Sequence, residues 1–142
     1  MRKLNDHPLY CFLSETEIIR LKSVAHQQLY QPQETIIRMG NRSRDIISLE
    51  QGKVSISSNT EDGSSRAVAR LDARSRIGAM NFIIPTRRTA DVIALCEVDT
   101  IIFPYAQLCE LLKSEPDLAH KVFAALSLQL RNKLLAMLHS AT

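Results

Sequence analysis

A glycine and an arginine ten residues apart, Gly78 and Arg88, bracket the stretch of this sequence whose residue types best suit binding chemistry. Gly78 follows a basic segment and precedes an apolar run long enough for one helical turn, which Pro85 ends. Glycine lets a ligand approach the backbone closely, and the first N–H groups of a helix are free to bind an anion. A guanidinium closes such a site well, because it is permanently charged and offers several donors. The spacing therefore predicts a small anion-binding cradle.

Positive charge is concentrated around this cradle. Between residues 66 and 88 there are six arginines and one acid, Asp72, a local charge of +5, whereas the whole chain carries +3. The arginines are Arg66, Arg70, Arg74, Arg76, Arg87 and Arg88. Any one of them is equally well explained as a solvated strand residue, since arginine is mostly exposed in folded proteins. The cluster as a whole predicts an anionic ligand.

Length and composition are those of an ordinary globular domain that can bury a core. No uncharged apolar run approaches the roughly 18 residues that span a bilayer, and the start of the chain lacks the apolar centre of a signal peptide. The cysteines, Cys11, Cys96 and Cys109, are odd in number and have no C-x-x-C spacing. We therefore expect reduced, mostly buried thiols in a cytoplasmic protein that meets membranes only indirectly.

The elements that must position the cradle begin with a helix. Ser14-Glu15-Thr16-Glu17 has the form of a capping box, and Leu13 and Ile18 are placed as a hydrophobic staple. Apolar residues then follow at helical spacing, which predicts a helix over residues 14–25.

Short strands are expected over residues 26–103. The individual segments are 36–38, 45–50, 53–58, 66–71, 89–95 and 98–103, all rich in β-branched or alternating residues. Glu61-Asp62-Gly63-Ser64 is a hairpin signal, because Asp-Gly tolerates positive φ. Turns at intervals of about 8–12 residues predict an antiparallel barrel or sandwich.

Helical patterns return over residues 104–139. A short helix is expected from Tyr105 to Lys113, and Ser114-Glu115-Pro116-Asp117 starts a long one, because proline is tolerated in the first turn. One apolar stripe of the long helix contains Leu118, Val122, Leu126, Leu130, Leu134 and Met137, and Phe123, Leu135 and Leu138 widen it. Two interpretations stay open: the helix packs on its own barrel, or its far end pairs with another copy or a neighbouring domain.

Several motifs, taken in order, resemble the cyclic nucleotide-binding domain family. Ile-Ile-Arg-Met-Gly at residues 36–40 and the strand-glycine-strand segment at 46–54 are similar to the family's early strands, and Gly78 and Arg88-Thr89-Ala90 to the ends of its phosphate-binding cassette. The likeness covers about residues 10–138. It implies one mainly β domain over residues 1–142, an antiparallel eight-stranded, jelly-roll-like β-roll with an N-terminal helix and two C-terminal helices.

By this resemblance Arg88 holds the phosphate of cyclic AMP or cyclic GMP, and Thr89 is the small residue beside it. The backbone N–H groups of Ala79 and Met80 would add donors. Arg87 is the competing arginine, but alternation along a strand sends neighbouring side chains to opposite faces. The spacing from the glycine favours Arg88.

Two positions depart from the family pattern. The glutamate that accepts the ribose hydroxyl is replaced by Ala79, although Asn81 has suitable chemistry to substitute for it. A charge-assisted hydrogen bond of that kind contributes about 1.5–3 kcal/mol, so weaker nucleotide binding is expected. Arg74 replaces the glycine of a Leu-x-x-Gly turn, where its side chain could narrow the pocket or add a cation.

Two functions are compatible with these features, and a third, an enzyme, is not. The first is a regulatory module that senses a small phosphate-bearing ligand and signals through its C-terminal helices. The second is a degenerate member that binds no nucleotide and serves as a docking or oligomerisation module of a larger transporter or enzyme, through a parent domain or a second copy. An enzyme is not expected, nor is a cofactor or metal, because His7, His26, His120 and His139 are scattered and no nucleophile–base pair is visible.

Direct nucleic-acid binding is not expected either. Transcription regulators of the family carry a helix-turn-helix domain after the long helix, and this sequence has no residues left for one. The positive charge lies at the cradle rather than along a recognition helix. The C-terminal segment is instead similar to that of domains appended to bacterial sulfate-permease-type transporters or to glutaminases.

Overall fold

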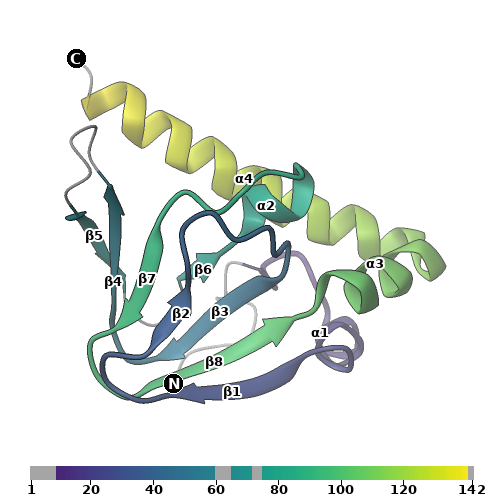
Figure 1. The fold of residues 1–142 in the computed structure, drawn as a ribbon. Coiled ribbons are helices and arrows are strands. Elements are labelled where there is room, and N and C mark those ends of the chain that lie inside the picture. Colours follow the sequence, from purple (N-terminus) through teal and green to yellow (C-terminus); the bar gives the residue numbers. More distant parts are fainter. Residues whose placement is uncertain (1–8, 60–64, 72–74, 141–142) are drawn as a thin grey trace. The chain divides into compact units, whose positions relative to one another are not determined.

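The computed structural model describes residues 9–59, 65–71 and 75–140. They belong to two compact units, a β-unit that spans Ala25–Tyr105 and a helical unit made from residues 9–24 and 106–140. The order of elements along the chain is a helix, eight strands interrupted by a short helix, and two further helices (Figure 1).

The β-unit contains two four-stranded antiparallel sheets. One has the order β1 (His26–Tyr30), β8 (Val98–Phe103), β3 (Ile46–Gln51) and β6 (Arg76–Ile77). The other has the order β2 (Thr35–Ile37), β7 (Asp91–Ala94), β4 (Val54–Asn59) and β5 (Ser65–Leu71). This arrangement confirms the predicted fold class, an antiparallel eight-stranded β-roll with flanking helices.

Side chains from both sheets form one hydrophobic core. β3 is buried at four successive positions, 46–49, and it lies inside its sheet between β8 and β6. The buried core cluster contains Ile37, Ile47, Leu49, Val54, Val92, Ala94 and Val98. Branched aliphatic side chains suit the pleated inner faces of packed sheets, which explains why these segments read as strands.

Several predicted boundaries differ from the structure by one residue, and two differ by more. The first helix, α1 (Glu15–Lys22), ends before residue 25, because the chain is already extended at His26, where β1 starts to pair with β8. β7 begins at Asp91 instead of residue 89, because the residues before it bond to the loop after β2 rather than to a strand. The predicted hairpin turn at 61–64 and Arg74 lie outside the described residues.

The predicted helical turn after Gly78 is present as α2 (Ala79–Ile83). The N–H of Phe82 donates to the carbonyl of Gly78 at 2.8 Å, which closes the turn. Pro85 follows two residues after the helix ends, and its ring would not allow the helix to continue. The turn places Asn81 and Phe82 directly beyond the glycine.

In the helical unit the predicted capping box of α1 is formed. The Ser14 N–H donates to the Glu17 carboxylate at 2.9 Å, and the Glu17 N–H donates to the Ser14 hydroxyl at 3.2 Å. Lys121 of the last helix donates to the same carboxylate at 2.9 Å. These bonds, first the one from the Ser14 backbone and then the one from Lys121, lower the pKa of Glu17. Arg20 and Glu115 form a second ion pair in this unit.

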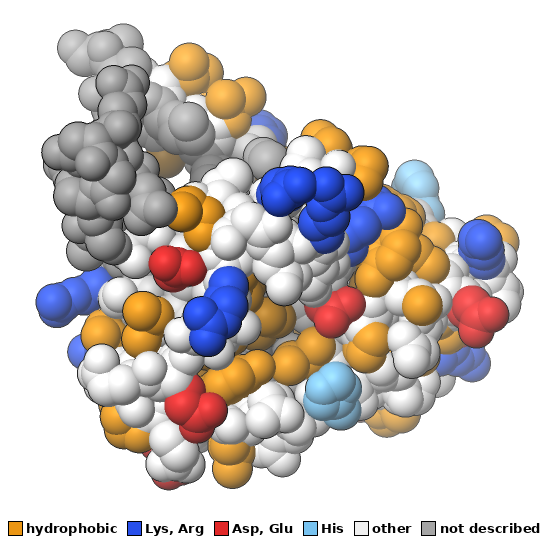
Figure 2. Space-filling view, in the orientation of Figure 1, with side chains coloured by type: hydrophobic (Ala, Val, Ile, Leu, Met, Phe, Trp, Pro, Cys, Tyr) orange, Lys and Arg blue, Asp and Glu red, His pale blue; other side chains and the backbone are white. Residues whose placement is uncertain are grey.

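The two C-terminal helices are α3 (Tyr105–Ser114) and α4 (Pro116–Ser140). The first half of α4 is buried through Leu118, Val122, Ala125 and Leu126. Large hydrophobic side chains are exposed from residue 123 onward, namely Phe123, Leu128, Leu134, Leu135 and Leu138. Figure 2 shows hydrophobic side chains, in orange, at the molecular surface along α4. Of the predicted stripe, Leu118, Val122 and Leu126 are therefore buried, Leu130 is half-buried and Leu134 is exposed.

The described part of the chain was predicted to contain no membrane-spanning helix and no disulfide bond. None of its helices is both long and apolar enough to cross a bilayer. Cys11, Cys96 and Cys109 are free thiols, and each is half-buried rather than buried, unlike the expectation. The Cys96 sulfur accepts a weak hydrogen bond from the Lys53 N–H at 3.3 Å.

Candidate anion-binding site

Arg88 is the buried arginine of the predicted cradle. Its N–H donates to the Asn41 carbonyl at 2.7 Å, and its own carbonyl accepts from the Gly40 N–H at 2.8 Å. This local pairing keeps the backbone extended, so neighbouring side chains point in opposite directions. Arg88 is only 4% exposed, whereas Arg87 and Thr89 are exposed. Of the two adjacent arginines, the one inside the β-unit is Arg88.

The guanidinium of Arg88 meets only neutral acceptors among the described residues. Nη2 donates to the Asp45 carbonyl at 2.8 Å and weakly to the Ser43 hydroxyl at 3.4 Å. Nη1 donates to the Asn81 side-chain oxygen at 3.2 Å. Nε is buried and has no acceptor in the described part of the chain. One donor of the buried charge therefore remains available.

Burial lowers the pKa of the Arg88 guanidinium, and the negative charge of Asp45 opposes that effect. A buried charge without an ion-pair partner is costly, because neutral acceptors replace only part of its hydration. An anion beside Arg88 would reduce this cost. The electrostatics of the site therefore favour a negatively charged guest.

Gly78 makes room for that guanidinium. A Cβ at this position would lie 2.6 Å from Nη1 of Arg88 and 2.5 Å from the Asp45 carbonyl oxygen. The backbone of Gly78 also has φ +103°, a conformation that other residues rarely adopt. The structure thus brings together the two residues that bracket the predicted cradle.

Asn81 contacts the guanidinium of Arg88. Its oxygen accepts from Arg88, and its Nδ2 donates to the carbonyl of Thr86 at 3.0 Å and to the Thr86 hydroxyl at 3.3 Å. Both ends of the amide are therefore engaged within the loop. Asn81 holds the guanidinium in place, and its side-chain oxygen has a second lone pair that can accept a further hydrogen bond.

A cavity of about 300 Å³ lies in the β-unit beside Arg88. Its polar wall consists of Arg38, Asn41, Ser43, Asp45 and Arg88. Among the predicted site residues, Arg88 lines this cavity. Gly78 contacts the guanidinium of Arg88 but does not line the cavity. Ala90 is half-buried and does not line it either. The backbone of α2 begins at Ala79 and Met80, and nothing is described of their side chains.

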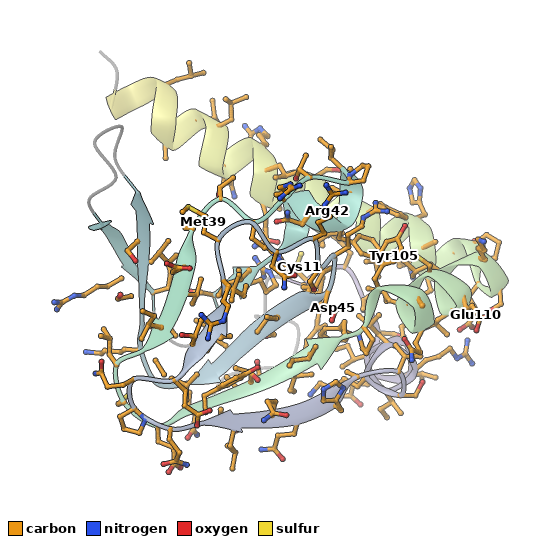
Figure 3. All side chains as sticks on the ribbon, in the orientation of Figure 1. Cys11, Met39, Arg42, Asp45, Tyr105 and Glu110 are labelled. Carbon is orange, nitrogen blue, oxygen red and sulfur yellow. The ribbon has the colours of Figure 1, made fainter. Side chains whose placement is uncertain are left out.

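Two residues that sequence reasoning did not select, Arg44 and Asp45, are central to the site. The Asp45 carbonyl accepts from Arg88, and its carboxylate accepts from the Tyr105 N–H at 2.8 Å. Figure 3 shows Asp45 and Tyr105 close to each other. Asp45 therefore touches both the buried guanidinium and the first residue of α3.

Arg44 fixes the end of α2 in a similar way. Its Nε donates to the Asn81 carbonyl at 2.9 Å and its Nη2 to the Phe82 carbonyl at 2.8 Å. Its Nη1 donates to the Tyr105 hydroxyl at 2.6 Å, and the guanidinium stacks 4.1 Å from the centre of that ring. Phe82 meets Tyr105 edge to face, with ring centroids 5.6 Å apart. The only sequence signal for these roles is the polar run of residues 41–45 directly before a buried strand.

The motifs and the geometry agree with a family-level comparison. A sequence model described as the cyclic nucleotide-binding domain matches residues 27–115. The chain belongs to the cyclic nucleotide-binding domain family. The matched residues include the Gly78–Arg88 cradle and both sheets of the β-unit, except for His26.

Solved structures share the fold of this cyclic nucleotide-binding domain. The N-terminal domain of a transcriptional regulator from Streptomyces coelicolor A3(2) has a TM-score of 0.81 and 24% identity, over 94% of each chain. A cyclic nucleotide-binding domain from Methylobacillus flagellatus has a TM-score of 0.80 and 22% identity, over 88% of this chain and 70% of the other.

The Thermus thermophilus catabolite activator protein has a TM-score of 0.77 and 22% identity, over 94% of this chain. The present chain spans 63% of that protein's length. At these identities the likeness establishes the fold. No curated protein matches the sequence. Within the described residues, no group of three or more histidine, cysteine or acidic side chains is placed to hold a metal ion.

Proposed function

We propose that this cyclic nucleotide-binding domain is a regulatory module that senses a small phosphate-bearing anion. The observation that carries the proposal is Arg88, a guanidinium only 4% exposed, with neutral acceptors and one donor that no described residue occupies. Such a group is costly to bury without an anion, and it is well shaped to bind one.

Cyclic AMP and cyclic GMP are the first ligands to test. A regulatory subunit of a cAMP-independent protein kinase A from Trypanosoma brucei was solved as a mutant with cAMP in its A site, and it shares the fold at 21% identity. In the present chain the phosphate would bind Arg88, with Thr89 and the N–H groups of Ala79 and Met80 nearby. Without a glutamate at position 79, the ribose would be held less strongly.

Signalling would start at the acceptors that Arg88 now uses. An anion that draws the guanidinium away from the Asp45 carbonyl and from Asn81 would loosen both of these residues. Asp45 holds the Tyr105 N–H, and Asn81 leads through Arg44 to the Tyr105 hydroxyl. Because Tyr105 begins α3, the C-terminal helices would receive the signal. The ligand can shift this equilibrium only by its difference in affinity between the two states.

Calorimetric titration of the full chain with cyclic AMP and cyclic GMP tests this function. Arg88→Ala should weaken binding about tenfold to a hundredfold, the range for a hydrogen bond to a charged group. Ala79→Glu should strengthen binding by about tenfold. Arg87→Ala removes the same charge one residue away and should change binding little.

Arg88→Lys keeps the charge and serves as a second variant in case Arg88→Ala does not fold, which a melting curve would show. It should still lose most of the affinity, because lysine cannot present two parallel donors. Equal binding by the wild type and a folded Arg88 variant would rule out the assignment of Arg88.

A second function is favoured by the exposed hydrophobic side chains of α4. In that case the domain would bind no nucleotide and would serve as a docking or oligomerisation module, through a second copy or a parent domain. Undetectable nucleotide binding by the wild type, restored by Ala79→Glu, would support this alternative. Neither function requires catalysis or contact with nucleic acid. Neither requires the domain itself to bind a membrane, with which it would associate only indirectly.

A further inference from the structure

The two loops that contact α2 carry positive charge that the site beside Arg88 does not use. Residues 38–44 and 84–90 contain five arginines and no acidic residue. Three of these arginines belong to the site described above, namely Arg38, Arg44 and Arg88. The other two, Arg42 and Arg87, are exposed, and neither side chain forms an ion pair or a hydrogen bond within the described part of the chain. Their charge is therefore available to a partner.

The acidic residues that follow the two loops bind backbone N–H groups. The Asp45 carboxylate accepts from the Tyr105 N–H at 2.8 Å, and the Asp91 carboxylate accepts from the Met39 N–H at 2.7 Å. Neither carboxylate forms an ion pair with an exposed arginine among the residues that the structure describes. The outer side of the loops is therefore positive, and it favours an anionic partner.

Two exposed isoleucines lie at the end of α2. Ile83 is its last residue and Ile84 follows it, and their side chains are 37% and 48% exposed. Figure 2 shows hydrophobic side chains, in orange, next to basic ones, in blue, over α2. Single exposed apolar residues are common, but arginine and exposed apolar groups together are typical of interfaces with other proteins.

Hydrogen bonds between the loops hold these side chains in one place. The Arg88 N–H donates to the Asn41 carbonyl at 2.7 Å, and these two residues directly adjoin the exposed arginines. Arg44 donates to the carbonyl of Phe82, directly before the isoleucines, and Figure 3 shows Arg42 beside α2. A surface that is fixed before binding loses little conformational freedom on binding. We call this patch the α2 surface, and it consists of Arg42, Ile83, Ile84 and Arg87.

We propose that the α2 surface binds a short acidic segment of a partner protein that also carries apolar side chains. Guanidinium groups pair with carboxylates through two parallel hydrogen bonds, and the isoleucines would pack against the apolar side chains of the segment. The inference goes beyond anion recognition by Arg88 and does not depend on it, because neither Arg42 nor Arg87 lines the cavity.

Nucleic acids and lipid bilayers match the α2 surface less well. Single-stranded nucleic acids stack their bases on aromatic side chains, of which the α2 surface has none, and duplexes bind more polar surfaces. Binding at a bilayer interface commonly uses tryptophan, phenylalanine or leucine, and this chain contains no tryptophan. An acidic protein segment is therefore the favoured partner.

Fluorescence anisotropy of the full chain with labelled dodecapeptides tests the proposal. The probe has glutamates on both sides of two central leucines, and two matched peptides replace either the glutamates by glutamine or the leucines by serine. The wild type should bind the probe, and more weakly as sodium chloride rises from about 0.1 to 1 M, because salt screens exposed charges. Both matched peptides should bind at least about fivefold more weakly.

Arg42→Gln and Arg87→Gln should each weaken binding of the probe up to about fivefold, and together by the product of the two effects. Ile84→Ser should weaken it about fivefold, because roughly half of this side chain is available for burial. The matched controls are Arg70→Gln, at an exposed position of β5, and Ile19→Ser, at a position of α1 that is 71% exposed. Neither control should change the affinity.

Equal binding of the probe by the wild type and the Arg42→Gln/Arg87→Gln double variant would overturn the proposal. Tighter binding to phosphatidylserine vesicles or to a short DNA duplex, lost in the same double variant, would also overturn it, because the surface would then serve a membrane or a nucleic acid. Cyclic AMP titrated into the double variant separates this inference from the proposed function. Loss of the probe with unchanged nucleotide titration supports the α2 surface, whereas loss of both would place the effect at Arg88 and overturn it.

Because all of these substitutions are at exposed positions, the variants should keep the wild-type melting curve.

Discussion

At the scale of single residues, the contact between Gly78 and Arg88 sets the geometry of the site. The missing Cβ of Gly78 is the space that Nη1 of Arg88 and the Asp45 carbonyl use. Gly40 offers a natural comparison, because it also has a positive φ, +87°, but a Cβ there would meet nothing within 4 Å. Alanine substitutions at the two glycines can therefore separate the energetic cost of backbone strain from that of close packing.

We predict that Gly78→Ala is considerably more destabilising than Gly40→Ala. Backbone strain alone should cost about 1–2 kcal/mol at either position, and overpacking should add about 1–3 kcal/mol at Gly78. Chemical denaturation of both variants would measure the difference. Gly78→Ala should also lose the binding of any ligand held by Arg88, and Gly40→Ala should keep it. Equal destabilisation would mean that the close approach has no energetic role.

At the scale of elements, α2 depends on a side chain from another segment. A helix of five residues is not stable by itself, and its last carbonyls need partners. Arg44 supplies them by donating to the carbonyls of Asn81 and Phe82 while it stacks on Tyr105. Arg44 therefore connects the cassette helix to the start of α3.

We predict that Arg44→Lys increases hydrogen exchange at the α2 amides, most clearly at Phe82, whose N–H closes the turn. The loss of one or more charge-assisted bonds, about 1.5–3 kcal/mol each, should raise local opening about tenfold to a hundredfold. Hydrogen-exchange mass spectrometry would detect this change. Arg42→Lys, the same substitution at an exposed position nearby, should leave α2 unchanged. An unaffected α2 in Arg44→Lys would remove Arg44 from the proposed signalling route.

At the scale of the whole molecule, the far half of α4 carries exposed hydrophobic side chains. Leu134 and Leu138 are 56% and 54% exposed, and they follow Phe123 and Leu130 at spacings that place them on one side of a helix. An apolar side of this length is typical of a helix that pairs with a partner.

We predict that the chain self-associates through this side of α4 and that Leu134→Glu together with Leu138→Glu makes it monomeric. Buried like charges would oppose pairing, whereas exposed surface substitutions alter the free energy of unfolding by about 0.5 kcal/mol or less. Sedimentation velocity over a range of concentrations would show the change. Ile19→Glu on α1, where the side chain is 71% exposed, is the matched control and should have no effect. A wild-type protein that stays monomeric would leave a parent domain as the expected partner.

The amino-acid sequence by itself determined the order of elements, the strand-rich middle, the capping box of α1 and the family. These features depend on local spacing: alternation for strands, a three-residue interval for the cap, and ten residues from Gly78 to Arg88. Patterns that depend on a few neighbouring residues can be recognised in a sequence without knowledge of its tertiary contacts. The choice of Arg88 over Arg87 was also within reach, because alternation lets only one of the two point inward and the spacing from Gly78 favours Arg88.

Only the tertiary structure decided what surrounds Arg88. Asp45 lies 43 positions away in the chain, and Arg44 reaches Tyr105 across 61, so no local pattern could assign these contacts. The sequence also did not reveal that the Asn81 side chain contacts Arg88 and Thr86. The cavity is lined by side chains of β1, β2, β3 and β8 together with Arg88. Packing of distant segments, rather than residue type, therefore determined the candidate site.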